Sequence, residues 1–127
     1  MSKPENPKPT ASELEILQIL WMREPATVRE VHELLSATKT SGYTTTLKLM
    51  QIMYEKGLVT RDDSAKTHLY KSAVSKKKTQ KHLVDKMING LFGGSSTQLV
   101  LQALGNHNAT KSELEEIQKY LDDLKNK

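Results

Sequence analysis

The sequence predicts a mostly α-helical protein with one small β-hairpin, and two observations carry this prediction. First, the capping-box spacing S/T-x-x-E/Q recurs ahead of segments whose apolar residues follow a helical period, and each box predicts a helix N-terminus. Second, two short segments, 58–61 and 67–71, follow Gly57 and flank a charged tip, which indicates a pair of strands. A chain of 127 residues can hold one domain, or one small domain and an assembly segment.

The first two helices are expected to begin at capping boxes. A box at Thr10 starts an amphipathic helix that ends before Pro25, and a second box at Thr27 starts a helix that closes near Leu35. In each box the hydroxyl and the glutamate carboxylate satisfy backbone amides that the helix itself leaves without partners.

A third helix follows a polar turn over 36–42. It starts at Tyr43 and ends with Glu55, Lys56 and Gly57, after which the hairpin begins. The order helix, turn, helix, hairpin is that of a winged helix-turn-helix, a module that lays its second helix in the DNA major groove.

Three shorter helices are expected in the C-terminal part. The first runs from about Ser75 to Phe92 and stops at Gly93-Gly94, a pair that breaks helices and often allows a hinge. Boxes at Ser95 and Thr110 start the other two. The expected parts are a flexible N-terminal tail (1–9), a winged helix-turn-helix DNA-binding domain (10–74) and a three-helix dimerisation domain (75–127).

The C-terminal helices raise the question of what covers their apolar faces. A helical segment of about 50 residues can barely bury its own stripes. Packing within one chain is one interpretation, but we favour a homodimer interface, because so small a segment needs a further surface to close on. The expected dimer contacts are Leu83, Met87, Leu91, Leu99, Leu101, Leu104, Leu114, Ile117, Leu121 and Leu124.

Positive charge is concentrated in the middle of the chain. Residues 36–82 hold ten Lys or Arg against three acids, a balance of +7, whereas the remaining residues hold nine against twelve, a balance of −3. A solvated basic face would give the same count. Charge placed beside a helix-turn-helix is also the electrostatic pattern expected of a surface that faces phosphates.

A helical wheel of the third helix separates a core face from a candidate DNA-binding face. Thr46, Leu49, Met50 and Met53 share the core side. The outward residues are short, polar and basic, as suits contacts with base edges; Leu47 either meets a thymine methyl or covers the core edge. Hydroxyls before the helix and basic residues on the hairpin are candidates for phosphate contacts. The predicted DNA contacts are Thr27, Arg29, Ser41, Tyr43, Thr44, Thr45, Leu47, Lys48, Gln51, Arg61, Lys66 and His68.

Several functional classes lack support in the sequence. There is no cysteine, and the four histidines (His32, His68, His82 and His107) have no metal-binding spacing, so we expect no metal or other cofactor. No catalytic set stands out, so we expect no enzyme. No segment is apolar enough for a signal peptide or a membrane span, so a soluble cytoplasmic protein is expected.

These features together resemble the BlaI/MecI/CopY-type penicillinase repressor family. The resemblance extends from Thr10 to Leu124 and rests on the order and spacing of several stretches. They are SELEIL at 12–17 with LW at 20–21, TVREV at 27–31, YTTTL at 43–47, EKGLV at 55–59 and LFGGS at 91–95, followed by a Glu-rich final helix.

The resemblance implies a bacterial, dimeric winged-helix repressor that binds an inverted-repeat operator in double-stranded DNA, with the C-terminal helices forming an intertwined dimer. Some members are inactivated when a sensor metalloprotease pathway causes cleavage of an Asn-Phe bond in the C-terminal part, and the matching position here is Gln102-Ala103. Copper-responsive members carry a cysteine-rich end, so the absence of cysteine excludes copper sensing by that mechanism. A winged-helix module that binds protein and not DNA is the main alternative.

Overall fold

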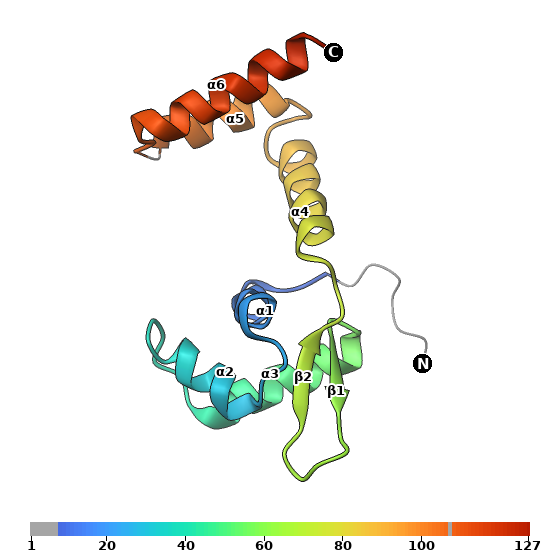
Figure 1. The fold of residues 1–127 in the computed structure, drawn as a ribbon. Helices are drawn as coiled ribbons and strands as arrows, with labels where there is room; N and C mark the ends of the chain where they lie inside the picture. Colours follow the sequence, from blue (N-terminus) through green and yellow to red (C-terminus); the bar gives the residue numbers. More distant parts are fainter. Residues whose placement is uncertain (1–7, 107) are drawn as a thin grey trace. The chain divides into compact units, whose positions relative to one another are not determined.

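The computed structural model describes residues 8–106 and 108–127, so most of the predicted tail (1–9), and His107, lie outside the described residues. Figure 1 shows helices and one hairpin, and the predicted fold class is confirmed. The elements are α1 (Ala11–Arg23), α2 (Val28–Leu35), α3 (Tyr43–Lys56), β1 (Val59–Asp62), β2 (Leu69–Ser72), α4 (Lys76–Gly90), α5 (Ser96–Asn106) and α6 (Lys111–Lys125).

Capping chemistry sets the start of most helices. Complete capping boxes are formed by Thr10 for α1, Thr27 for α2 and Thr110 for α6. At α5 only half of the predicted box forms. The Gln98 N–H donates to Ser95 Oγ at 3.1 Å, while the Ser95 N–H donates to the Phe92 carbonyl oxygen at 3.0 Å.

Helix α3 has different ends. Its N-cap is Gly42, which has no side chain to accept from the first amides, and its C-cap is Gly57 in the left-handed region at φ 84°. A residue with a Cβ is strained in that conformation, so glycine at position 57 allows the chain to turn directly from α3 into the hairpin.

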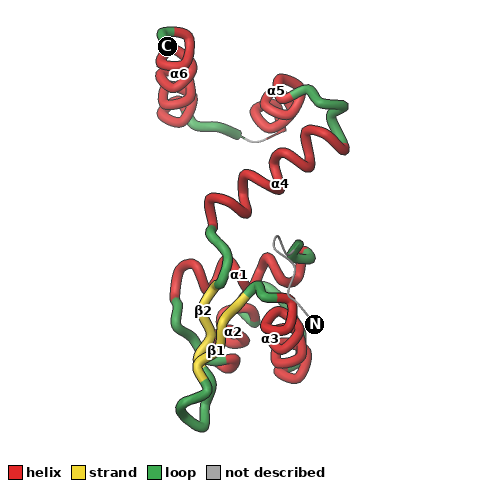
Figure 2. Tube along the Cα trace, turned by 90° about the vertical axis from the view of Figure 1, so that its right-hand side faces the viewer, coloured by secondary structure: helices red, strands yellow, loops and turns green. Residues whose placement is uncertain are grey.

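The hairpin differs slightly from the strands that the sequence predicts. The antiparallel register pairs Val59 with Ser72 and Asp62 with Leu69, so the strands are 59–62 and 69–72, not 58–61 and 67–71. Leu58 is instead part of the helix end, because its N–H donates to the Met53 carbonyl oxygen at 2.9 Å. The loop between the strands extends past α2 and α3 in both Figure 1 and Figure 2.

The hairpin is tied to the helices at two points. Ala26, between α1 and α2, exchanges backbone hydrogen bonds with Tyr70 at 3.0 and 2.8 Å. The Trp21 indole donates to Ser72 Oγ at 2.8 Å and to the Val74 carbonyl oxygen at 3.1 Å. These bonds hold the segment that leads from β2 toward α4 against the last turns of α1.

Burial divides the chain into two very different parts. Two compact units are found, residues 1–80 and 81–127. No described side chain of α4, α5 or α6 is buried. The buried apolar core lies within the first unit and consists of Ile16, Leu17, Leu20, Ala26, Val28, Val31, Leu35, Met50, Met53, Leu58, Val59 and Tyr70.

Candidate nucleic-acid interface

Helix α3 presents a polar outer face opposite its core face. Thr46, Met50 and Met53 are buried, and Leu49 is half-buried against the core, much as the helical wheel predicts. Leu47 is also half-buried and packs on the core edge. The exposed residues along the outer face are Thr44, Thr45, Lys48 and Gln51.

A hollow of about 480 Å³ separates α3 from the hairpin loop. The start of α2 forms its third wall. Eight of the twelve predicted DNA contacts line it: Thr27, Arg29, Tyr43, Leu47, Gln51, Arg61, Lys66 and His68. The structure thus brings together residues from three separate elements, whereas Ser41, Thr44, Thr45 and Lys48 lie outside this lining.

The starts of α2 and α3 meet in a small cluster of side chains. The Arg29 guanidinium lies 4.9 Å from the centre of the Tyr43 ring, in cation–π geometry. The His32 ring is perpendicular to that of Tyr43, with the centroids 5.7 Å apart. His32 Nδ1 lies 3.0 Å from the hydroxyl oxygen of Thr46, a hydrogen bond that joins α2 to the buried side of α3.

Acidic residues organise the hairpin loop. Arg61 Nε lies 2.7 Å from Asp63 Oδ1, and His68 Nδ1 lies 3.4 Å from the same oxygen. The Arg61 guanidinium also stacks on the Tyr54 ring at 4.1 Å, and its neighbours Tyr70 and Asp63 raise the pKa of Arg61 further above its ordinary value. Arg61 therefore stabilises the loop through Asp63 and Tyr54. Although it also lines the hollow, its charge is paired with Asp63.

Asp62 has a comparable role at the turn. Its Oδ1 accepts from the Ser64 N–H at 2.9 Å, and this bond lowers the pKa of the Asp62 carboxyl. Exposed Lys66 follows in the same loop, and no ion pair is found for it among the described residues.

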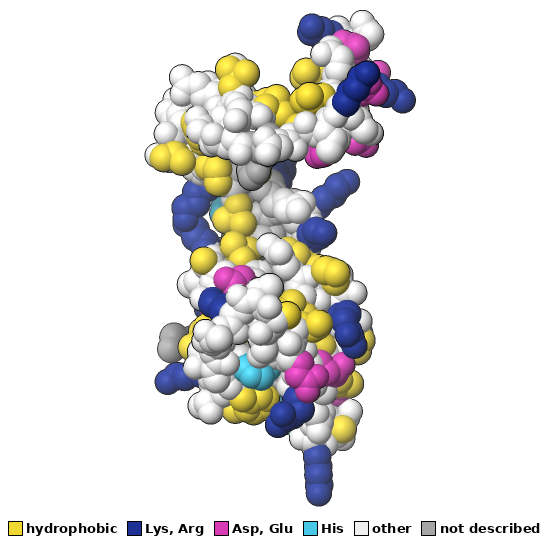
Figure 3. Space-filling model, turned by 90° about the vertical axis from the view of Figure 1, so that its left-hand side faces the viewer, with side chains coloured by type: hydrophobic (Ala, Val, Ile, Leu, Met, Phe, Trp, Pro, Cys, Tyr) yellow, Lys and Arg dark blue, Asp and Glu magenta, His cyan; other side chains and the backbone are white. Residues whose placement is uncertain are grey.

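The positive charge of residues 36–82 does not form one patch. Three of its ten basic residues are paired: Lys39 with Glu15 at 3.3 Å, Lys56 with Glu13 at 2.6 Å, and Arg61 with Asp63. Lys76, Lys77 and Lys78 follow the end of β2 opposite the hairpin loop. On the face drawn in Figure 3, acidic, apolar and uncharged side chains lie among the basic ones. Arg29, Lys48 and Lys66 are among the cationic side chains left exposed near α3 and the loop.

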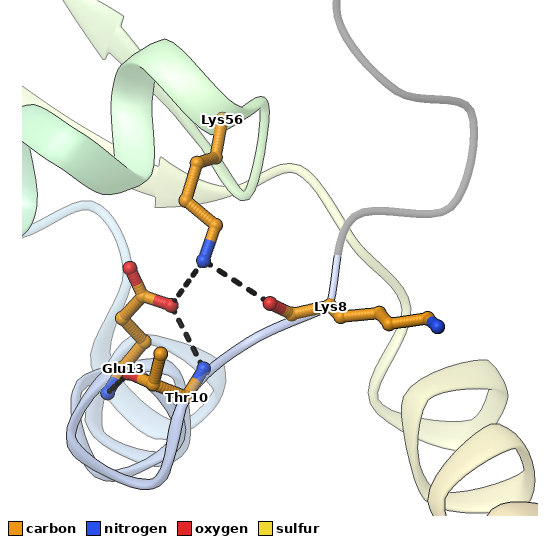
Figure 4. Close-up of polar contacts among 4 residues, drawn as sticks. All are labelled: Lys8, Thr10, Glu13 and Lys56. Atoms are coloured by element: carbon orange, nitrogen blue, oxygen red, sulfur yellow. Dashed lines mark hydrogen bonds and ion pairs between the residues drawn. The ribbon is translucent and has the colours of Figure 1, made fainter.

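Glu13 is a buried charged residue, and the sequence predicts only its capping role. It is 2% exposed, and Figure 4 shows Lys56 Nζ between its carboxylate and the Lys8 carbonyl oxygen, at 2.6 and 3.1 Å. Burial raises the pKa of Glu13, but the bonds from Lys56 and Thr10 outweigh it, and the pKa is lowered overall. The pair fastens the start of α1 to the end of α3.

The predicted dimer contacts lie in the open, on helices α4, α5 and α6 except for Leu91, which follows the end of α4. Leu91, Leu101 and Leu114 are 73%, 64% and 47% exposed, and the other members of the set are half-buried or exposed as well. Within the described residues there is no group of His, Asp or Glu side chains that could hold a metal ion, and no helix long and apolar enough to span a membrane.

Residues 9–123 match the family model described as penicillinase repressor. The chain belongs to the penicillinase repressor family. The family consists of transcriptional repressors and not of enzymes. The resemblance inferred from the stretches between Thr10 and Leu124 is therefore confirmed.

Individual relatives are similar over different shares of the chain. The methicillin resistance regulatory protein MecI of Staphylococcus aureus is 25% identical over 112 residues, covering 88% of this chain and 91% of that protein. The transcriptional regulator BlaI of Mycobacterium tuberculosis is 41% identical over 56 residues, covering 43% and 41%. The solution structure of the DNA-binding domain of the repressor BlaI aligns with a TM-score of 0.53 at 21% identity, covering 59% of this chain and 90% of that domain, and it shows a shared fold.

Two further positions can now be located. Gln102-Ala103, which the family resemblance matches to the Asn-Phe bond of some members, lies inside α5 with both residues exposed. His32, which is not among the predicted DNA contacts, is half-buried between Tyr43 and Thr46. The sequence carries one signal for this position: Arg29 and His32 are three residues apart, so they share the side of α2 that bears a predicted DNA contact.

Proposed function

We propose that the chain is a homodimeric transcriptional repressor that binds an inverted-repeat operator. In this proposal α3 enters the major groove with Thr44, Thr45, Lys48 and Gln51 toward the bases. The hairpin loop and the start of α2 lie along the phosphate backbone, which the exposed lysine of the loop, Lys66, would contact. Residues 10–74 bind DNA, and residues 75–127 hold the dimer together.

The observation that carries the proposal is the uncapped start of α3. Gly42 provides no side-chain cap, and the Tyr43 and Thr44 amides have no hydrogen-bond partner among the described residues. Backbone amides at a helix N-terminus bind anions, and the polar outer face of α3 begins there. A phosphate beside these amides would place the exposed threonines and Lys48 at the neighbouring base edges.

Dimerisation is supported by the lack of burial in the second unit. Three helices that bury no side chain leave their apolar stripes in water, which is unfavourable by about 25 cal/mol for each Å² of apolar surface. A second copy would cover these stripes. A twofold dimer presents two α3 helices related by symmetry, and this is the reason to expect an inverted repeat.

Selection from a random-sequence duplex pool tests the proposal. We expect the full-length protein to enrich a sequence with twofold symmetry and to bind it as two chains per duplex in sedimentation. Binding should weaken steeply with salt, because each phosphate contact releases counterions. Enrichment of no sequence, together with binding that salt does not affect, would leave the protein-binding module as the better interpretation.

Control by a protease remains a prediction from the family resemblance. The bond at Gln102-Ala103 lies within a helix, and a protease needs the backbone extended, so cleavage there requires local unfolding of α5. Incubating the protein with a cell extract and mapping the fragments by mass spectrometry tests whether this bond is cut.

A further inference from the structure

Tyr43 is held on both sides at the start of the helix that we assign to the major groove. The Arg29 guanidinium covers its ring at 4.9 Å, and the His32 ring meets it at 88° with a centroid separation of 5.7 Å. Its side chain lines the hollow, and its hydroxyl has no hydrogen-bond partner within the described part of the chain. A fixed ring with an unused hydroxyl is thus presented on the candidate DNA-binding surface.

We infer that His32 is a positioning residue for DNA binding, holding Tyr43 so that its hydroxyl donates to a DNA phosphate. The inference rests on the proposed function, DNA binding through α3. His32 itself does not contact DNA in this arrangement. It acts through the ring of Tyr43, while its other contact, the bond to Thr46, keeps the imidazole in place.

The physical reason is the cost of ordering an exposed side chain. A tyrosine at the first position of a helix has few neighbours, and its rotamers must be restricted before its hydroxyl can bind in one place. Here Arg29 and His32 restrict the rotamers of Tyr43 already in the protein without DNA. His32 is anchored in turn, because Nδ1 bonds to Thr46, which is 1% exposed, and Nε2 lies 3.4 Å from Ser36 Oγ.

Two conservative variants separate the ring contact of His32 with Tyr43 from its bond to Thr46. His32→Asn places an amide nitrogen near the position of Nδ1, so the bond to Thr46 is kept and the ring contact with Tyr43 is lost. His32→Phe keeps an aromatic ring beside Tyr43 and loses the bond. If His32 positions Tyr43, His32→Asn weakens DNA binding with little change in stability, whereas His32→Phe binds DNA nearly as wild type does and is less stable.

The measurements are fluorescence anisotropy on the duplex that wild type selects from a random pool, and urea unfolding of the full chain. We expect His32→Asn to weaken binding by about two- to tenfold, the factor that an aromatic edge contact supports. Tyr43→Phe should weaken binding similarly, and the double variant should lose little more than either single one. His82→Asn, on the exposed side of α4, is the matched control and should change neither quantity.

Different failures have different meanings. Wild-type protein that selects and binds no duplex overturns both this inference and the proposed function. Wild-type binding with additive losses for His32→Asn and Tyr43→Phe overturns the positioning role alone. The same holds if affinity follows stability across the two His32 variants, because His32 would then act only through the fold.

Discussion

Glu13→Gln isolates the charge of the buried ion pair from the cap that the same residue forms. Glutamine is also accepted at this position of a capping box, so the bond with Thr10 is retained and only the charged bond to Lys56 is weakened. Glutamine keeps an oxygen that can accept from the Lys56 ammonium but removes the carboxylate charge, so the loss is a part of the about 1.5–3 kcal/mol that a hydrogen bond to a charged group contributes. Because the Lys56 side chain is 31% exposed, solvent screens part of this contribution, and we expect a loss of about 1 kcal/mol.

The stability lost in Glu13→Gln should depend on pH in a direction that can be checked. The pKa of Glu13 is lowered in the folded protein, so its charge stabilises the fold above the ordinary value of 4.5, and this stabilisation is lost as pH falls through the lowered pKa. Urea unfolding should therefore separate wild type from Glu13→Gln at about pH 7 and bring them together as pH falls through the lowered pKa of Glu13. Equal stability at neutral pH, or a gap that persists in acid, would refute the reasoning.

Glu15→Gln is the matched control. Glu15 pairs with Lys39 at 3.3 Å, but both side chains are 45% exposed, so the expected change is about 0–0.5 kcal/mol. A loss as large as that of Glu13→Gln would mean that burial does not distinguish the two pairs.

Three further predictions address binding, assembly and the end of α3. Lys48→Ala should weaken binding to the selected duplex by about 1–3 kcal/mol and spare binding to a random duplex; an equal loss on both in anisotropy assays would assign Lys48 to phosphate. Joint replacement of Ile117 and Leu121 by Asp should yield monomers with reduced affinity for the selected duplex, and an intact dimer in sedimentation would place the interface elsewhere. Gly57→Ala should lower stability by about 1–2 kcal/mol in urea unfolding, because φ is 84° there, whereas Gly105→Ala, with open space around it, should not.

The parts of the fold that sequence predicts well are those with local causes. A capping box is closed within three residues, so Thr10, Thr27 and Thr110 mark their helices without reference to the rest of the chain. The core face of α3 follows from helical period alone. Strand ends are less local, because they depend on pairing across the hairpin. The Leu58 N–H is bonded to the end of α3, and the strand pairing starts only at Val59.

Eight of the predicted DNA contacts line one hollow, whereas a count of charge over 36–82 does not describe which basic residues are available. A count over 36–82 treats every lysine as available, yet Lys39 and Lys56 are paired with glutamates 24 and 43 residues away in the chain. Such distant partners leave no local signal. The contacts of His32 are hidden for the same reason, since the turn between α2 and α3 decides which side chains meet.

The hydrogen bonds of Trp21 allow the segment after the hairpin to be followed by tryptophan fluorescence. It is the only tryptophan in the chain, and its indole is bonded to Ser72 and Val74, just before α4 begins. Tryptophan emission therefore comes from one place, the contact of α1 with the strap, residues 72–75, that connects the end of the DNA-binding fold to the following helix. Release of that strap would expose the indole to water and shift the emission to longer wavelength, so an unlabelled protein reports on this connection while it binds DNA.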